Sequence, residues 1–296
     1  MQPLPEDTFR PRLSGSTVMC DTIAGPLAVH VAGHGAPLLF IHSVNAAASA
    51  AELRPLHEHY AASHTVFSPD LPGFGASPRI RRLYTPRLMT DALHGMVEHI
   101  GRQMGPAPID ALALSLSCEF LARAASERPA RFKTLALISP TGLSGRLQRR
   151  APEGSTAAMP RLHRVLQWIG PGLFKGLTRP SVIRFFLQKT WGGPQIDALM
   201  FEEAVRTARA GGAEYAPLSF LCGALFSRDI LNVYESLQLP VWMCHGVRGD
   251  FTDYRQKALL ESRSNWTVRV FPTGALPHFE RPADVLAALD AHWAGA

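Results

Sequence analysis

The order of the apolar segments predicts an α/β protein with a mostly parallel sheet and helices on both faces. Short, continuously apolar runs such as Pro37–His42 and Phe132–Ile138 are typical of strands that are covered on both sides. Longer helical segments such as Tyr84–Gly101 separate these runs, and strands that alternate with helices form parallel sheets. With 296 residues, of which 46% are hydrophobic and 18% charged, the chain can bury one large core.

The expected elements follow one another along the chain, separated by segments rich in turn residues. Pro69–Ser77 is such a loop, and a helix is expected from Thr85-Pro86 because proline suits the first helical turn. The expected strands are Thr17–Cys20, Leu27–Val31, Pro37–His42, Thr65–Ser68, Ile109–Leu114, Phe132–Ile138, Leu239–His245 and Trp266–Phe271, and the expected helices are Glu52–Ser63, Tyr84–Gly101, Leu116–Arg128 and Pro282–Trp293.

The alternation of strands and helices stops in the second half of the chain, where helical segments dominate from about residue 143 to 235. Strand character resumes near Leu239. We therefore expect residues 1–142 and 236–296 to form one core, with residues 143–235 as a helical insertion. The sequence shows no internal repeat or low-complexity tract.

Ser115 is the first candidate for chemistry, because an apolar strand stops at this serine and a helix begins directly after it. A serine at a sharp strand-to-helix turn exposes its hydroxyl at the carboxyl edge of a sheet. The amide that follows lies at a helix N-terminus, where a developing negative charge is stabilised. The usual Gly-x-Ser-x-Gly frame is replaced here by Ala113 and Ser117, which are also small. Cys118 is a weaker rival nucleophile.

A base and an acid are available beyond two later strands. His278 follows the last expected strand, and Asp250 follows the strand before it. Histidine can remove the proton of a serine hydroxyl, and a carboxylate behind the imidazole orients it. The chain order Ser115, Asp250, His278 is typical of one serine-hydrolase architecture. Asp253 is an alternative acid.

With these residues the chain resembles the α/β-hydrolase superfamily from about Thr17 to Trp293. The resemblance implies the α/β-hydrolase fold, with residues 143–235 as the cap, and assigns Ser115 as nucleophile, His278 as base and Asp250 as acid. It also implies an oxyanion hole made by the Leu116 and Val44 amides. The motifs that carry it are Phe40-Ile-His42, Asp70-Leu-Pro-Gly-Phe-Gly-Ala-Ser77, the turn around Ser115, His245-Gly246 before Asp250, and Pro277-His278-Phe-Glu-Arg-Pro282.

The resemblance further implies a hydrolase that cleaves a carboxylic ester, thioester or lactone through an acyl-enzyme, in the manner of a carboxylesterase. His42-Ser43 replaces the usual His-Gly pair, and Asn45 offers a side-chain donor. Apolar cap residues favour a substrate with an apolar portion. No cofactor or metal is expected. The alternatives are a C–C bond hydrolase using the same triad, or a binding protein that has lost catalysis. The expected substrate-binding residues are His42, Ser43, Asn45, Trp168 and Phe185.

Charge and composition favour a small molecule as the binding partner of this protein. The formal net charge is +6. The segment from Arg146 to Lys189 contains nine Arg or Lys residues and a single acid, Glu153. The aromatic signatures of RNA binders are absent, so no nucleic acid is expected. A solvated basic face is the leading interpretation, and weak association of the basic cap with a membrane surface is the alternative. The chain start has no secretory pattern, which favours a cytoplasmic protein. The oligomeric state is left open.

Overall fold

The computed structural model describes residues 2–3, 12–145 and 149–295 of the chain. This part forms a nine-stranded sheet in the order β1-β2-β3-β5-β4-β6-β7-β8-β9. The strands from β5 across to β9 pair in parallel, whereas β1, β2 and β3 add an antiparallel edge. The strands are β1 (Gln2–Pro3), β2 (Ser16–Thr22), β3 (Gly25–Ala32), β4 (Pro37–Ile41), β5 (Thr65–Pro69), β6 (Ile109–Leu114), β7 (Phe132–Ile138), β8 (Val241–Gly246) and β9 (Trp266–Phe271).

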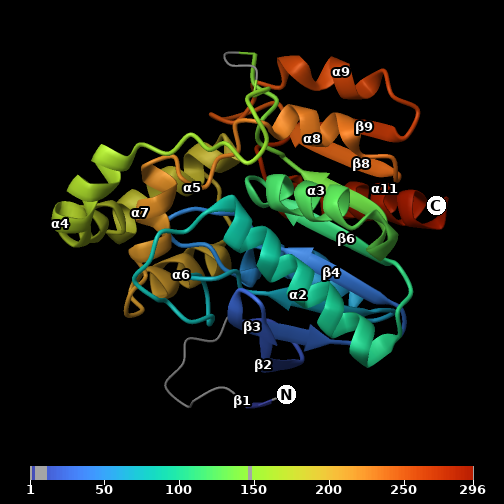
Figure 1. Ribbon diagram of the computed structural model, residues 1–296, viewed down its shortest axis with the longest axis horizontal. Coiled ribbons are helices and arrows are strands. Elements are labelled where there is room, and N and C mark those ends of the chain that lie inside the picture. Colours follow the sequence, from blue (N-terminus) through green and yellow to red (C-terminus); the bar gives the residue numbers. More distant parts are fainter. Residues whose placement is uncertain (1, 4–11, 146–148, 296) are drawn as a thin grey trace.

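Helices cover both faces of the sheet, so the predicted class of fold is confirmed. Figure 1 shows α2 and α3 in front of the strands, with helices α4 to α7 of the insertion gathered beyond one end of the sheet and α8 beside β8. The helices are α1 (Arg54–Tyr60), α2 (Pro86–Met104), α3 (Ser117–Glu127), α4 (Pro160–Leu177), α5 (Pro180–Trp191), α6 (Ala198–Ala208), α7 (Tyr215–Leu221), α8 (Ile230–Ser236), α9 (Ala258–Glu261), α10 (Pro277–Glu280) and α11 (Pro282–Ala294), with short 3-10 turns η1 (Ala50–Leu53), η2 (Pro129–Arg131) and η3 (Arg255–Lys257).

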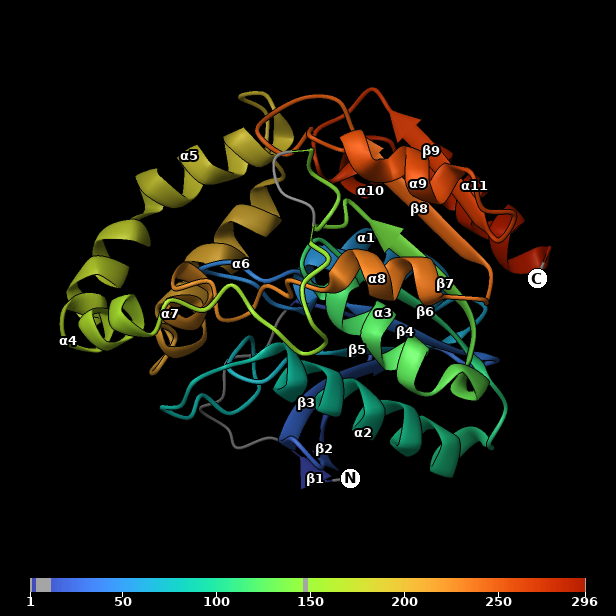
Figure 2. The ribbon, with the colours of Figure 1, turned by 45° about the horizontal axis from the view of Figure 1, so that its top comes forward.

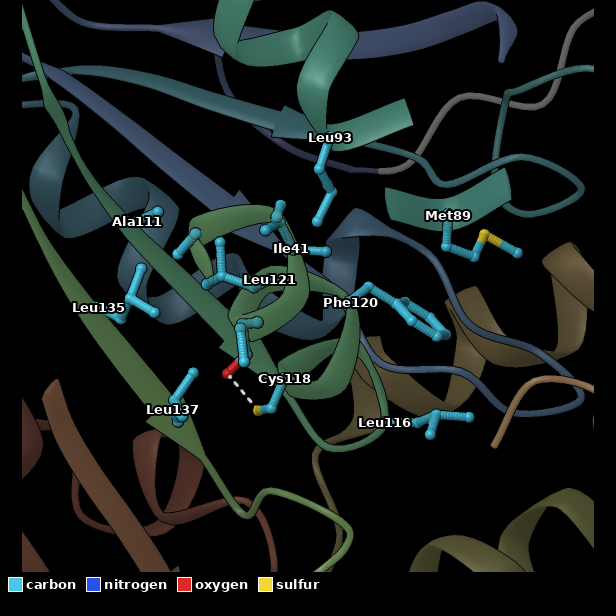
Figure 3. Packing of buried hydrophobic residues seen from close by; sticks show 14 of the residues in the cluster. Ile41, Met89, Leu93, Ala111, Leu116, Cys118, Phe120, Leu121, Leu135 and Leu137 are labelled. Atoms are coloured by element: carbon cyan, nitrogen blue, oxygen red, sulfur yellow. Dashed lines mark hydrogen bonds between the residues drawn. The ribbon is translucent and has the colours of Figure 1, made fainter. Parts of the chain in front are cut away.

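The strands are buried on both faces because successive side chains point to opposite sides. Along β4, Leu39 and Ile41 belong to the apolar cluster under α2 and α3, whereas Leu38 and Phe40 belong to the cluster under α1 and α11. Figure 3 shows Leu93 of α2 and Ile41 of β4 among the residues of the first of these clusters. This double burial explains why the strand sequences are continuously apolar.

The structure differs from the expected elements at a few places. The helix expected over Glu52–Ser63 begins as the 3-10 turn η1 and continues as α1, with Pro55 in the first turn of α1, where its missing N–H costs nothing. The short elements β1 and α9 have too few residues to give a periodic pattern. Helices α4 to α8 lie between β7 and β8, and Tyr234 of α8 belongs to the main core cluster with Phe120. The limits of the insertion, 143 and 235, stay a prediction.

Candidate active site

Ser115 occupies a sharp turn between the end of β6 and the start of α3. Its φ is 57°, a left-handed conformation that non-glycine residues rarely adopt and that costs about 1–3 kcal/mol. The turn is held by the Ser115 amide, which donates to the carbonyl oxygen of Ile138 at 2.8 Å, and by the Cys118 amide, which donates to the Ser115 carbonyl at 3.1 Å. The half-buried Ser115 stands at the carboxyl end of a central strand, as the sequence predicts.

The rival nucleophile Cys118 lies in the first turn of α3, beyond the position of Ser115. The thiol is fully buried and donates to the Ala113 carbonyl at 3.2 Å, a contact that Figure 3 marks with a dashed line. Burial raises the pKa of the Cys118 thiol well above its ordinary value, so a reactive thiolate is disfavoured. Ala113 and Ser117 are also fully buried beside the turn, which forms without the flanking glycines.

Ser139 is a second serine at this edge of the sheet, and no sequence motif points to it. Leu114 and Ile138 are register partners in the parallel strands β6 and β7, so Ser115 and Ser139 follow adjacent strand ends. Ser139 has a φ of 49°, and its hydroxyl donates to the Ala275 carbonyl at 2.7 Å. This hydrogen bond ties the loop that follows β9 to the strand ends next to Ser115. Only the pairing of β6 with β7 shows that Ser139 lies beside Ser115.

His278 lies in α10 and is fully buried. Its Nε2 lies 2.8 Å from the Glu52 carbonyl oxygen, and because a carbonyl only accepts, this nitrogen carries the hydrogen. The buried Nδ1 has no hydrogen-bond partner among the described residues. Burial lowers the pKa of His278 from 6.5 to about 4, so the imidazole is neutral at neutral pH. Neither ring nitrogen is hydrogen-bonded to Ser115, so the predicted base and nucleophile are not paired.

The predicted acid does not pair with His278 either. The carboxylate of Asp250 is 56% exposed and lies 3.4 Å from Lys189 Nζ. The alternative acid, Asp253, accepts from the Arg255 guanidinium, which lowers the pKa of Asp253 below its ordinary value. Among the described residues, no hydrogen bond joins Ser115 to His278 or His278 to Asp250, so the catalytic relay of these three residues stays a prediction. Each of the three follows a strand, but the direction of its side chain depends on the backbone turns of its loop.

The loop after β4 is organised by Glu52, a buried acid to which no sequence motif points. Its carboxylate accepts from the Ser43 amide at 2.8 Å and from the Asn45 side-chain amide at 2.6 Å. Asn45 also donates to Ser43 Oγ, and its Oδ1 accepts from the Ala47 amide. The side chain of Asn45 therefore stabilises its own loop and has no free donor for a substrate oxygen.

His42 also has a structural role. It is fully buried, its Nδ1 donates to the Ser43 carbonyl at 2.6 Å, and its Nε2 accepts from the Leu71 amide at 2.9 Å. Both ring nitrogens of His42 are thus occupied by backbone groups, and a contact with a substrate stays a prediction. The Leu116 amide lies at the N-terminus of α3, where helical amides lack an intrahelical acceptor. Leu116 and Val44 stay the predicted oxyanion donors.

The end of helix α5 covers the two loops that follow β8 and β9. The Ala275 amide donates to the Thr190 carbonyl at 2.8 Å. At Gly274 an added Cβ would lie 2.3 Å from the Trp191 carbonyl oxygen, so the backbones touch there. The predicted substrate-lining residues Trp168 and Phe185 are instead 85% and 52% exposed. They lie on the outside of the insertion, because other residues of α4 and α5 form the packed side.

A cavity of about 280 Å³ lies next to the start of α4, between residues of the insertion and Leu83 of the loop before α2. None of the predicted site residues lines it. Among the described residues, no group of three or more His, Cys, Asp or Glu side chains could hold a metal ion. The lining residues are Leu83, Ala158, Met159, Pro160, His163, Arg164, Cys222 and Ala224.

Comparison with known proteins agrees with this fold. The model of the alpha/beta hydrolase family matches residues 28–289, and the chain belongs to that family. Comparison with curated proteins finds no match in sequence. Solved structures similar to this chain include a thermophilic esterase from Thermogutta terrifontis, with 21% identity, coverage of 94% of this chain and 97% of that chain, and a TM-score of 0.68.

Two further similar structures carry other activities. The epoxide hydrolase CorEH is 17% identical, with coverage of 95% of this chain and 99% of that chain and a TM-score of 0.71. The meta-cleavage product hydrolase CumD from Pseudomonas fluorescens is 15% identical, with coverage of 94% and 97% and a TM-score of 0.72. Identities this low show the common fold alone, and the three named activities differ from one another. The chemistry of this chain must therefore be argued from its own residues.

Proposed function

We propose that this chain binds a small carbonyl- or carboxylate-containing molecule at the Ser115 turn and does not hydrolyse it through a Ser-His-Asp cycle. The observation that carries the proposal is the placement of His278. A general base must reach the proton that it removes, and His278 is instead buried with its Nε2–H on the Glu52 carbonyl. Its pKa of about 4 also makes it a weak base at neutral pH.

The ligand class follows from the groups that remain at the turn. The Ser115 hydroxyl is half-buried at a strand end, and the Leu116 amide opens helix α3. An oxygen atom with partial or full negative charge is the natural ligand for amides at a helix N-terminus. A carbonyl or carboxylate oxygen fits this chemistry, and a cationic ligand does not.

The second candidate is the ester, thioester or lactone hydrolase that the sequence predicts. The specific observation in its favour is the left-handed backbone of Ser115, a strain that costs free energy and that clusters at functional sites. For this function His278 would have to leave its contact with Glu52 and turn toward Ser115. A C–C bond hydrolase using the same residues meets the same requirement.

Ester turnover by variants separates the two candidates. We expect wild type, Ser115→Ala and His278→Gln to hydrolyse p-nitrophenyl butyrate at the same background rate. Ser126→Ala, which removes a hydroxyl near the far end of α3, is the matched control. A wild-type rate that falls about a hundredfold or more in both Ser115→Ala and His278→Gln, with Ser126→Ala unchanged, would overturn the proposal and establish the hydrolase.

Binding is tested separately by isothermal titration with butyrate. We expect heat of binding in wild type and in Ser126→Ala, and its loss in Ser115→Phe, whose ring would block the turn. Circular dichroism of each variant checks that the fold is retained. Absence of binding to wild type, or binding that Ser115→Phe retains, would contradict the assignment of this site.

A further inference from the structure

Helix α4 carries a row of apolar side chains that are partly exposed to solvent. Leu162, Val165, Ile169 and Leu173 are spaced by three or four residues and therefore share one side of the helix. They are between 37% and 57% exposed, and Trp168 beside them is 85% exposed. Contiguous exposed apolar surface on a soluble fold marks an interaction site more often than chance.

The packed side of α4 is different and is already occupied. Leu166 is buried in one cluster with Leu218 of α7, and Phe174 is buried in another with Ile183 of α5. Residues other than the exposed apolar ones therefore pack α4 against α5 and α7. Helix α5 adds Phe185 and Phe186, each 52% exposed. Figures 1 and 2 both show α4 at the periphery of the molecule, away from the central sheet, and Figure 2 shows α5 along the outer edge beside it.

The charged residues within the segment that forms this surface are all positive. No Asp or Glu occurs between residues 154 and 196, whereas six Arg or Lys residues do. Arg161 and Arg164 precede Trp168 by seven and four residues, so they lie on the same side of α4. Among these six residues, only Lys189 has an ion pair within the described chain, with Asp250. The six are Arg161, Arg164, Lys175, Arg179, Arg184 and Lys189.

We propose that the exposed side of α4 and α5 binds the surface of an anionic lipid bilayer. Exposed apolar side chains, a tryptophan and unpaired basic residues are the features of helices that lie in a membrane interface. The residues of the described chain form no helix long and apolar enough to span a membrane, so association would be peripheral. A second copy of the chain is a poorer partner for this side, because two like-charged surfaces would repel each other.

Vesicle sedimentation tests the proposal with the whole chain. We expect the protein to pellet with phosphatidylcholine vesicles that contain phosphatidylglycerol, less so at high salt, and not with phosphatidylcholine alone. Trp168→Ser/Ile169→Ser and Arg161→Gln/Arg164→Gln should each weaken binding about tenfold or more. The matched controls are Ile23→Ser, which removes an apolar side chain that is 67% exposed elsewhere, and Arg81→Gln/Arg82→Gln, which removes an exposed basic pair.

Fluorescence gives a second reading at the predicted contact. The chain has five tryptophans, and the other four are at most 9% exposed. A blue shift on adding anionic vesicles would therefore report on Trp168. Three outcomes would overturn the proposal: no binding to anionic vesicles, equal binding by the Trp168/Ile169 variant, or a lipid-free dimer that the same variant dissociates. Circular dichroism and thermal unfolding check that the variants fold.

Discussion

Replacing His278 by glutamine should remove a large part of the acid sensitivity of this protein. The fully buried imidazole has a pKa of about 4 in the folded state, against 6.5 ordinarily. Between these two pH values the imidazole is protonated in the unfolded chain and neutral in the folded chain. The free energy of unfolding therefore falls as the pH drops from about 6.5 to about 4. A difference of about 2.5 pKa units corresponds to about 3 kcal/mol lost by wild type over that window. Glutamine does not titrate and retains a donor for the Glu52 carbonyl.

Urea unfolding at neutral pH and at about pH 4 measures this difference. We expect wild type to lose about 3 kcal/mol more than His278→Gln between the two conditions, because contributions of other groups cancel in the comparison. His34→Gln, at an exposed position, should behave like wild type. An equal loss in wild type and His278→Gln would refute the buried, neutral imidazole. A triad histidine stabilised by a carboxylate would have a raised pKa, and wild type would then lose less stability than the variant.

Two further predictions concern packing and charge. Arg123→Met should lower the free energy of unfolding by about 3–5 kcal/mol, because it leaves the carboxylate of Asp229 buried without the guanidinium that lies 2.6 Å away. Chemical denaturation measures this loss. As the control, Arg128→Met, at an exposed position, should lower the free energy of unfolding by at most about 1 kcal/mol. Gly274→Ala should destabilise by about 1–3 kcal/mol, because its Cβ would meet a backbone carbonyl of α5. Gly211→Ala, with open space around it, is the control, and equal thermal midpoints for the two alanine variants would contradict the close contact.

Local patterns in the sequence were sufficient to predict how strands and helices follow one another. Burial on both faces makes strands such as β4 continuously apolar, and the switch of pattern at Ser115 places the strand-to-helix turn correctly. The small side chains of Ala113 and Ser117 are fully buried beside that turn, whose left-handed backbone at Ser115 is visible only in the structure. These features depend on interactions between residues close in sequence or on the simple inside-outside division of a sheet.

The arrangement of the site was decided by contacts between distant segments. His278 meets the carbonyl of Glu52, which is 226 positions earlier in the chain, and no local pattern encodes that approach. Asp250 pairs with Lys189 because the end of α5 packs on the loop after β8. The sequence by itself determined the family, the sheet and the turn at Ser115. Only the tertiary structure decided which groups His278 and Asp250 contact, because a side chain's direction depends on the packing of the whole loop.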